Sequence, residues 1–180
     1  AEALSLCNTT GGAFDITVYP LMELWGFTTG NFAVPDAAAL AVRISADTGL
    51  RVSDVLSIRS GDLAPTMQVT ERKTGKARRV RLRPATLAAA RAYASHGHAQ
   101  LIPYNRSTIY RQIRTAAAEL GYTHISMHSI RKYYARQYCR AHGLAATQRE
   151  MQHNYLSTTL LYVLDPTDID KMIGGQDDGN

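Results

Sequence analysis

The chain has 180 residues, of which 45% are hydrophobic and 19% charged, and this composition excludes a disordered or fibrous protein and suits one compact domain. Its apolar runs are far shorter than the roughly 20 residues of a membrane helix, so we expect a soluble protein. Two cysteines, Cys7 and Cys139, are too few for a disulfide framework and favour a reducing compartment.

Charge is distributed unevenly along the chain. The formal net charge is +5, but residues 1–71 contain eight acidic and three basic residues, whereas residues 72–149 contain sixteen basic residues and one acidic residue. Most of the basic residues are Arg, whose planar guanidinium matches the geometry of phosphate oxygens. The middle of the chain is therefore predicted to face a polyanion, and nucleic acid is favoured over a solvated basic face.

Local signals predict a mainly helical chain with one small antiparallel sheet. In chain order, we expect helices over residues 21–25, 37–47, 52–60, 84–94, 107–120, 126–141 and 147–153, and another that begins at residue 157. Two strands, over 67–71 and 78–82, flank the turn Lys73-Thr74-Gly75-Lys76 and predict a β-hairpin with a positively charged turn. The expected fold class is mainly α, within α+β.

Capping residues support these bounds. Side chains suited to helix N-caps are Asp36, Ser107, Ser126 and Ser157, and glycines suited to helix ends are Gly49, Gly121 and Gly143. A new helix at Ser157 implies a break between His153 and Tyr162. In one continuous helix each residue adds a rotation of about 100°, so two side chains nine residues apart would point to opposite sides of the helix.

Six residues have side chains that could carry chemistry: Arg51, Lys73, His128, Arg131, His153 and Tyr162. Each is ordinary when taken alone. A tyrosine in an apolar run is by default a core aromatic, and a histidine and an arginine three residues apart merely share a helix face. A lysine in a basic hairpin is by default a solvated charge. Their order and spacing distinguish the six from these ordinary cases.

Taken together, these residues resemble the catalytic domain of the tyrosine recombinases, the phage integrase family. The matching segments are Thr48-Gly49-Leu50-Arg51-Val52-Ser53-Asp54, Lys73-Thr74-Gly75-Lys76, His128-Ser129-Ile130-Arg131, and His153 with Tyr162 nine residues later. Any single segment is weak, but four in the family's order are specific. One departure is Met151-Gln152 before His153, where the family has Leu-Gly.

The resemblance implies how three of these residues act on DNA. Arg51 and Arg131 would neutralise the negative charge that builds on the non-bridging oxygens of a phosphodiester in its pentacoordinate transition state. Tyr162 would attack phosphorus and form a 3′-phosphotyrosine. Because this intermediate conserves the bond energy, no ATP is required.

The resemblance also assigns the proton transfers. Lys73 would protonate the departing 5′ hydroxyl, His128 would assist proton removal from the tyrosine, and His153 would donate a hydrogen bond to the phosphate. Because cationic side chains stabilise the charge, neither a metal nor another cofactor is expected.

Further basic residues are expected to contact backbone phosphates: Arg72, Lys76, Arg78, Arg79, Arg81, Arg106, Arg111 and Arg114. The resemblance implies a homotetramer on two double-stranded DNA sites, with a monomer as the alternative in free solution. It also implies a cytoplasmic, DNA-associated protein of prokaryotic or viral origin, with no membrane partner.

The expected organisation has three parts. Residues 1–35 are a linker or the first helix of the catalytic domain, residues 36–164 are the catalytic domain, and residues 165–180 are a tail. Family members carry a further N-terminal domain that clamps DNA, so we interpret the chain as a catalytic fragment.

The function expected is site-specific recombination through a Holliday junction, for integration, excision or transposition of a mobile element. Two alternatives stay open. One is a type IB topoisomerase-like enzyme, although its usual serine-lysine-containing tyrosine motif is absent. The other is a non-catalytic DNA-binding regulator on the same fold, against which the complete catalytic set counts.

Overall fold

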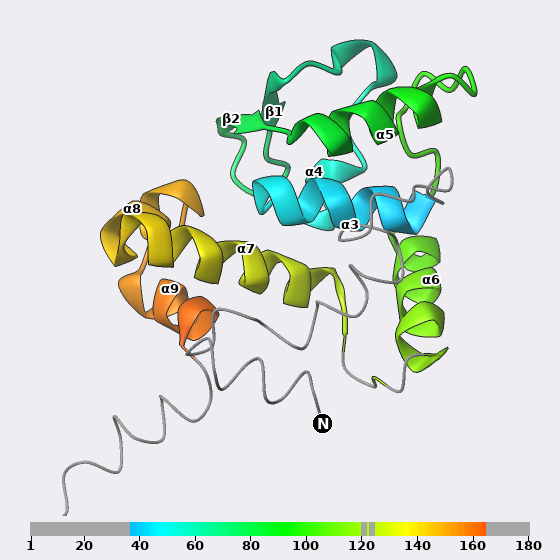
Figure 1. Ribbon diagram of the computed structural model, residues 1–180. Helices are drawn as coiled ribbons and strands as arrows, with labels where there is room; N and C mark the ends of the chain where they lie inside the picture. The colour runs from blue at the N-terminus through cyan, green and yellow to red at the C-terminus, as the bar shows by residue number, and fades with distance from the viewer. Residues whose placement is uncertain (1–36, 120–121, 123–124, 165–180) are drawn as a thin grey trace, which may run out of the picture. The chain divides into compact units, whose positions relative to one another are not determined.

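The computed structural model describes residues 37–119, 122 and 125–164. Their helices and strands are drawn in Figure 1. They fall into two compact units that divide between Tyr134 and Ala135. The expected linker, tail, helix over 21–25, Asp36 cap and Gly121 stop lie outside the described residues.

Helices make up most of both units, as predicted. The first unit contains α3 (Ala37–Thr48), α4 (Val52–Val55), the 3-10 helix η1 (Ser60–Asp62), β1 (Thr66–Thr70), β2 (Ala77–Arg81), α5 (Pro84–Ala94), α6 (Arg106–Glu119) and the start of α7 (Met127–His142). The second unit contains the end of α7, α8 (Leu144–Glu150) and α9 (Leu156–Val163). The fold class of helices with a small antiparallel sheet is confirmed.

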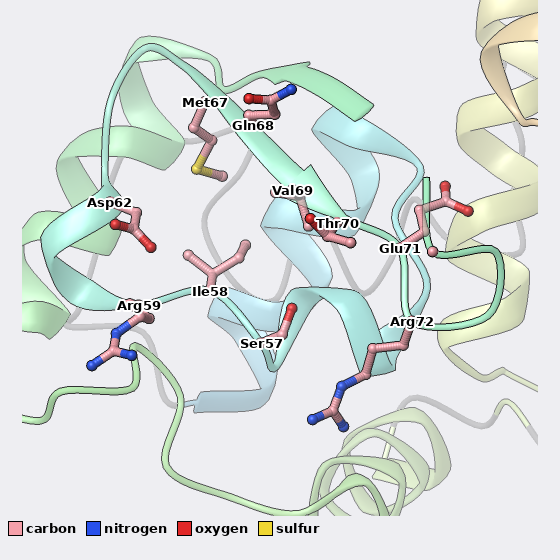
Figure 2. Close-up of a pocket in the computed structure, with 11 residues that line it drawn as sticks. Ser57, Ile58, Arg59, Asp62, Met67, Gln68, Val69, Thr70, Glu71 and Arg72 are labelled. Carbon is pink, nitrogen blue, oxygen red and sulfur yellow. The ribbon is translucent and has the colours of Figure 1, made fainter. Parts of the chain in front are cut away.

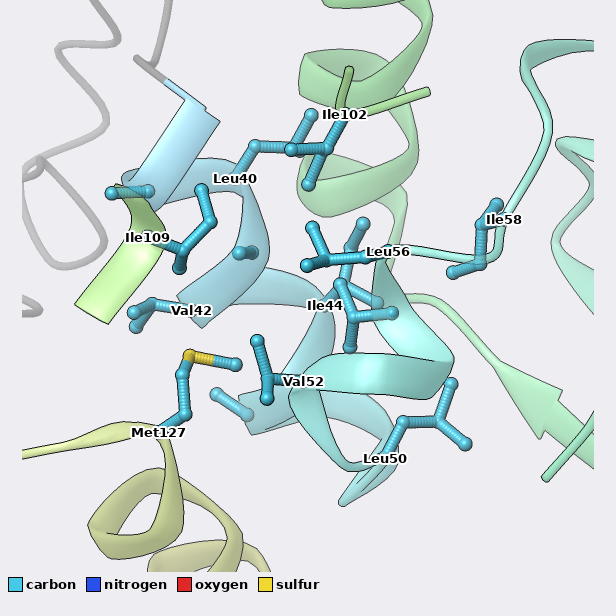
Figure 3. Close-up of a cluster of buried hydrophobic side chains, with 14 of the residues drawn as sticks. Leu40, Val42, Ile44, Leu50, Val52, Leu56, Ile58, Ile102, Ile109 and Met127 are labelled. Atoms are coloured by element: carbon cyan, nitrogen blue, oxygen red, sulfur yellow. The ribbon is translucent and has the colours of Figure 1, made fainter. Parts of the chain in front are cut away.

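Helix α3 is the centre of the first unit. It is buried on nearly all sides and packs against α4, α5, α6 and β2, which is the pattern of a core helix. Leu40, Val42 and Ile44 are fully buried, and burying each such side chain stabilises the fold by about 1.5–3 kcal/mol. Figure 3 shows them facing side chains from other segments: Val52, Leu56, Ile102, Ile109 and Met127.

The hairpin is confirmed, with each strand one residue earlier than predicted. In β1 and β2 buried and exposed residues alternate, and Met67 pairs with Val80 on the buried face. At the turn, the Glu71 amide donates to the Lys76 carbonyl (2.9 Å), and the Gly75 amide donates to the Glu71 carbonyl (2.8 Å). Gly75 has a φ of +67°, a conformation that glycine adopts at little cost.

The helix predicted over 52–60 is wrong beyond Val55. The Ile58 carbonyl accepts a hydrogen bond from the Leu101 amide (2.9 Å), and Arg59 forms an isolated β-bridge with Gln100. These pairings require an extended backbone at 58–59. A contact more than 40 residues away along the chain therefore ends α4 after one turn.

Of the N-caps predicted for α6 and α7, the one for α7 is confirmed and the one for α6 is wrong. Ser126 caps α7 as predicted, since its Oγ accepts a hydrogen bond from the His128 amide (3.2 Å). Ser107 does not cap α6. The helix begins at Arg106, and Asn105 takes the capping role, its Oδ1 accepting from the Thr108 amide (2.9 Å).

The second unit confirms a chain break between His153 and Tyr162. Helix α8 begins at Leu144 instead of the predicted 147, because Gly143 (φ +80°) is the N-cap and the buried Thr147 hydroxyl donates to its carbonyl (2.8 Å). Helix α9 begins one residue before Ser157. Between the helices Gln152 has a φ of +53°, so the residue that replaces the family's glycine adopts a backbone conformation that favours glycine.

Gly49 ends α3 in the left-handed conformation, as predicted. Its φ is +64° and its amide donates to the Ser45 carbonyl at 2.7 Å. A Cβ on Gly49 would lie 2.3 Å from Cδ1 of Tyr134, so this glycine is required for packing as well as for conformation.

We expect Gly49→Ala to lower the free energy of unfolding by more than Gly97→Ala. Both glycines have positive φ, but a Cβ at Gly97 would have no atom within 4 Å, so only the conformational term of about 1 kcal/mol applies there. Denaturant unfolding of the two variants measures the difference. Equal losses would contradict the close approach of Tyr134.

Candidate active site

Arg51 occupies the N-cap position of α4, directly after the Gly49 turn. Its Nη1 lies 2.6 Å from Oε2 of Glu71, whose side chain is fully buried. The Arg51 side chain itself is 24% exposed. The structure therefore anchors this guanidinium on one side and leaves part of it accessible to a ligand.

Arg131 lies in α7 and is 2% exposed. Its Nη1 donates a hydrogen bond to the carbonyl of Gly49, two residues before Arg51. The second predicted phosphate-binding arginine thus also holds the turn that carries the first. Arg51 and Arg131 both lie in the first unit.

Arg78 was expected to contact DNA, but its side chain is buried. It is 5% exposed, its Nη2 donates to the Thr48 carbonyl at 2.5 Å, and its Nη1 lies 3.6 Å from Oε1 of Glu71. Its guanidinium carbon also lies 5.9 Å from the centre of the Tyr134 ring. Arg78 shares the buried face of β2 with Val80, and we leave it out of the proposed DNA-contacting set.

Lys73 is exposed in the turn of the hairpin. The turn is tied to the rest of the unit next to it, because the Arg72 amide donates to Oδ1 of the buried Asp54 at 2.9 Å. Lys73 is therefore exposed, and the residue before it is held by Asp54. This arrangement suits a side chain that must reach a leaving group.

His128 lies in the first turn of α7, where the residue as a whole is exposed but its imidazole is partly shielded from solvent. Desolvation lowers the pKa of His128 below its ordinary value of 6.5, and the positive charges of Lys132, Arg131 and Arg51 lower it further. The imidazole is therefore mainly neutral at pH 7 and can accept a proton. The charges of both predicted phosphate-binding arginines act on it, which places the three residues in one electrostatic environment.

This lowered pKa predicts a pH-dependent stability. The folded protein binds the His128 proton less readily than the unfolded chain, so stability falls as the pH drops through 6.5 towards the folded pKa. We expect His128→Asn to reduce the loss of unfolding free energy between pH 7 and pH 5, measured by denaturant unfolding. His98→Asn, at an exposed position, is the control. The same pH dependence in wild type and His128→Asn would contradict this assignment.

In the second unit His153 and Tyr162 lie together. Their ring centroids are 4.7 Å apart in an edge-to-face arrangement. The His153 Nδ1 lies 3.1 Å from the hydroxyl of Thr159, which is fully buried one turn before Tyr162 on α9. The break after α8 thus returns His153 to the helix that carries the tyrosine.

The other basic residues predicted to contact phosphates are exposed: Arg72, Lys76, Arg79, Arg81, Arg106, Arg111 and Arg114. Arg79 and Arg81 project from the face of β2 opposite the buried one, and Arg111 and Arg114 are exposed on α6. The guanidinium carbon of Arg106 lies 5.5 Å from the centre of the Tyr110 ring, in a cation–π contact.

A groove of about 490 Å³ lies between β1 and the segment 57–62 (Figure 2). Its charged lining residues are Arg59, Asp62, Glu71 and Arg72, all labelled in Figure 2. None of the six predicted catalytic residues is among its lining residues.

The part of the chain that the structure describes holds neither a metal-binding cluster nor a membrane-spanning helix. No group of three or more His, Cys, Asp or Glu side chains is arranged to hold a metal ion in the described ranges. Within the same part of the chain, no helix combines the length and the apolar character needed to cross a bilayer.

Glu71 and Thr159 contact residues of the predicted set but were not themselves predicted from the sequence. Glu71 pairs with Arg51, and its signal was an acidic residue immediately before a long basic stretch. Thr159 contacts His153, and a polar residue within the apolar run of α9 was the only indication.

Solved structures of recombinases share this fold. The chain is similar to XerA recombinase (TM-score 0.68, 20% identity, 92% of this chain and 65% of that chain). It is also similar to a lambda integrase dimer bound to a COC′ core site, with a TM-score of 0.64 and 18% identity over 90% of this chain and 59% of that chain. A third similar structure is the catalytic domain of bacteriophage HP1 integrase, with a TM-score of 0.60 and 16% identity over 91% of this chain and 93% of that chain. The fold is therefore that of a tyrosine recombinase catalytic domain.

The sequence model of the phage integrase family matches residues 27–166, and the chain belongs to this family. That match includes all six predicted catalytic residues. The chain spans less than two thirds of the length of XerA recombinase and of the lambda integrase chain. No match was found among curated protein sequences.

Proposed function

We propose that the chain is the catalytic part of a site-specific tyrosine recombinase. It cleaves and religates DNA through a 3′-phosphotyrosine at Tyr162 and exchanges strands through a Holliday junction, to integrate, excise or transpose a mobile element. The observation that carries this proposal is membership of the phage integrase family over residues 27–166, a range that contains all six predicted catalytic residues.

The electrostatics of the first unit support phosphate chemistry. A phosphodiester is already anionic, and its transition state needs cations that are held in place before the reaction begins. Arg51 is anchored by Glu71, and Arg131 by the Gly49 carbonyl. The neutral His128 is suited to accept the proton of Tyr162, and the exposed Lys73 to protonate the leaving 5′ oxygen.

The proposed partner is double-stranded DNA, bound by a homotetramer. One structural neighbour is a lambda integrase dimer on a core site, and another is XerH recombinase on its difH substrate. The exposed arginines of β2 and α6 supply the phosphate contacts. We place the catalytic domain at residues 36–164 of a cytoplasmic, DNA-associated protein of prokaryotic or viral origin.

If the hairpin contacts phosphates, removing its exposed arginines should weaken the salt dependence of DNA binding. Each phosphate contact contributes about 0.9 to the slope of log K against log salt concentration. We therefore expect Arg79→Gln/Arg81→Gln to lower that slope by about 2 in fluorescence anisotropy titrations. Arg91→Gln, an exposed charge on α5, is the control. An unchanged slope in the double variant would show that the two arginines are solvated charges.

The proposed function is tested with a supercoiled plasmid that carries two copies of a site at which the protein forms covalent adducts with DNA. The reaction is run in EDTA, without ATP. Deleted or inverted products are expected without metal or ATP. Relaxed plasmid without recombinants would instead indicate a topoisomerase-like enzyme, and binding without either product would indicate a regulator.

A further inference from the structure

Glu71 is a buried carboxylate between two arginines at the end of β1. Its side chain is fully buried, Oε2 lies 2.6 Å from Nη1 of Arg51, and Oε1 lies 3.6 Å from Nη1 of Arg78. Arg78 is 5% exposed and is fixed to the Thr48 carbonyl. One carboxylate thus joins a core arginine to the arginine that is predicted to bind phosphate.

Stability alone is a weak reason for such a cluster. Buried ion pairs lose about as much free energy through desolvation as they gain by attraction, and apolar residues of similar volume often replace them without loss. Geometry is a stronger reason. A free arginine populates many rotamers, whereas catalysis requires the guanidinium to be held in place before the reaction begins. The Glu71 contact occupies Nη1 of Arg51 and leaves the side chain 24% exposed.

The main chain of Glu71 also closes the turn that contains Lys73. Its amide donates to the Lys76 carbonyl at 2.9 Å, and its carbonyl accepts from the Gly75 amide at 2.8 Å. The Thr74 hydroxyl lies 3.5 Å from the same Oε2 that binds Arg51. The residue that orients Arg51 is therefore part of the turn that carries the predicted general acid.

We propose that Glu71 is a positioning residue that holds Arg51 for the scissile phosphate and couples it to the turn carrying Lys73. This inference rests on the proposed function. Glu71 itself does not touch DNA in this account. It acts through the Arg51 guanidinium and through the turn, so its loss should slow the chemical step and leave DNA binding nearly intact.

The first test is Glu71→Gln, which keeps the side-chain shape and removes the charge. The substrate is duplex DNA that carries a site identified by covalent attachment of the wild-type protein. We expect single-turnover cleavage at saturating DNA to slow by about 10- to 100-fold, while the Kd for DNA changes by no more than about threefold. Glu119→Gln, exposed at the end of α6, is the matched control. Wild-type cleavage by Glu71→Gln would overturn the inference.

A second variant separates positioning from stability. Glu71→Gln leaves Arg78 buried without its carboxylate, which destabilises the fold. Glu71→Gln/Arg78→Met removes both charges, at the cost of the hydrogen bond from Arg78 to the Thr48 carbonyl, so we expect the unfolding free energy to recover in part while cleavage stays slow. Cleavage that recovers together with stability would show a merely structural role and overturn the inference.

Modified substrates identify the group through which Glu71 acts. A methylphosphonate at the scissile position removes one negative charge and reduces the need for Arg51, whereas a 5′ sulfur leaving group does not need the proton from Lys73. We expect the defect of Glu71→Gln to shrink on the methylphosphonate, as in Arg51→Ala, and to shrink in part on the sulfur substrate. A defect of the same size on all substrates would overturn the inference.

Failure of the proposed function has a different signature. A wild-type chain that forms no Tyr162-dependent adduct would contradict the recombinase assignment and this inference together. Wild-type adducts with a fully active Glu71→Gln variant would overturn the inference alone.

Discussion

Tyr162→Phe is expected to abolish SDS-resistant attachment of DNA while leaving DNA affinity within about threefold of wild type. The substitution removes only the hydroxyl. The ring remains to pack edge-to-face against His153 at 4.7 Å, so α9 should keep its structure. Without the nucleophile, cleavage should fall by about four orders of magnitude or more. Denaturing gels measure the adduct, and anisotropy measures the affinity.

Tyr155→Phe is the matched control for this result. Tyr155 precedes α9 and is 73% exposed, so the same chemical change there should leave adduct formation unchanged. An adduct of wild-type yield in Tyr162→Phe, or its loss in Tyr155→Phe, would contradict the assignment of the nucleophile.

Arg51→Ala is expected to slow single-turnover cleavage by about 10²- to 10³-fold. Loss of one group that stabilises transition-state charge typically has an effect of this size. The substitution also removes the Arg51 partner of the buried Glu71 carboxylate and leaves that carboxylate with Arg78, at 3.6 Å, as its ion-pair partner. Some loss of stability should therefore accompany the slower chemistry.

Two variants separate these effects. Arg51→Ala/Glu71→Gln/Arg78→Met removes all three charges of the cluster, so stability should recover in part while cleavage stays slow. Arg131→Ala should lose both activity and stability, because Arg131 is buried and holds the Gly49 carbonyl. Wild-type cleavage by Arg51→Ala would remove that residue from the site.

The parts of the fold that local signals determine were predicted well. Helix α5 runs over Pro84–Ala94 as expected, since proline suits the first helical turn, and Gly49 ends α3 in the expected conformation. The helix over 52–60 was wrong because the pairing of Arg59 with Gln100 is not visible in the local sequence.

The candidate site shows the same division. The resemblance to the recombinase family was enough to nominate Arg51 and Arg131, whose charges both lower the pKa of His128. The Glu71 contact could not be predicted, because it joins residues 20 apart that are separated by α4, η1 and β1. The burial of Arg78 could have been predicted, because Arg78 lies two residues before Val80 on β2 and residues two apart in a strand share one face.

The most direct test of the account is to identify both ends of the covalent bond. DNA-linked protein is trapped with SDS and digested with protease and nuclease, and the peptide that carries a nucleotide is sequenced by mass spectrometry. We expect a nucleotide joined through its 3′ phosphate to Tyr162, with a free 5′ hydroxyl on the other side of the cut. Attachment through a 5′ phosphate, or to any other residue, would contradict the proposed chemistry.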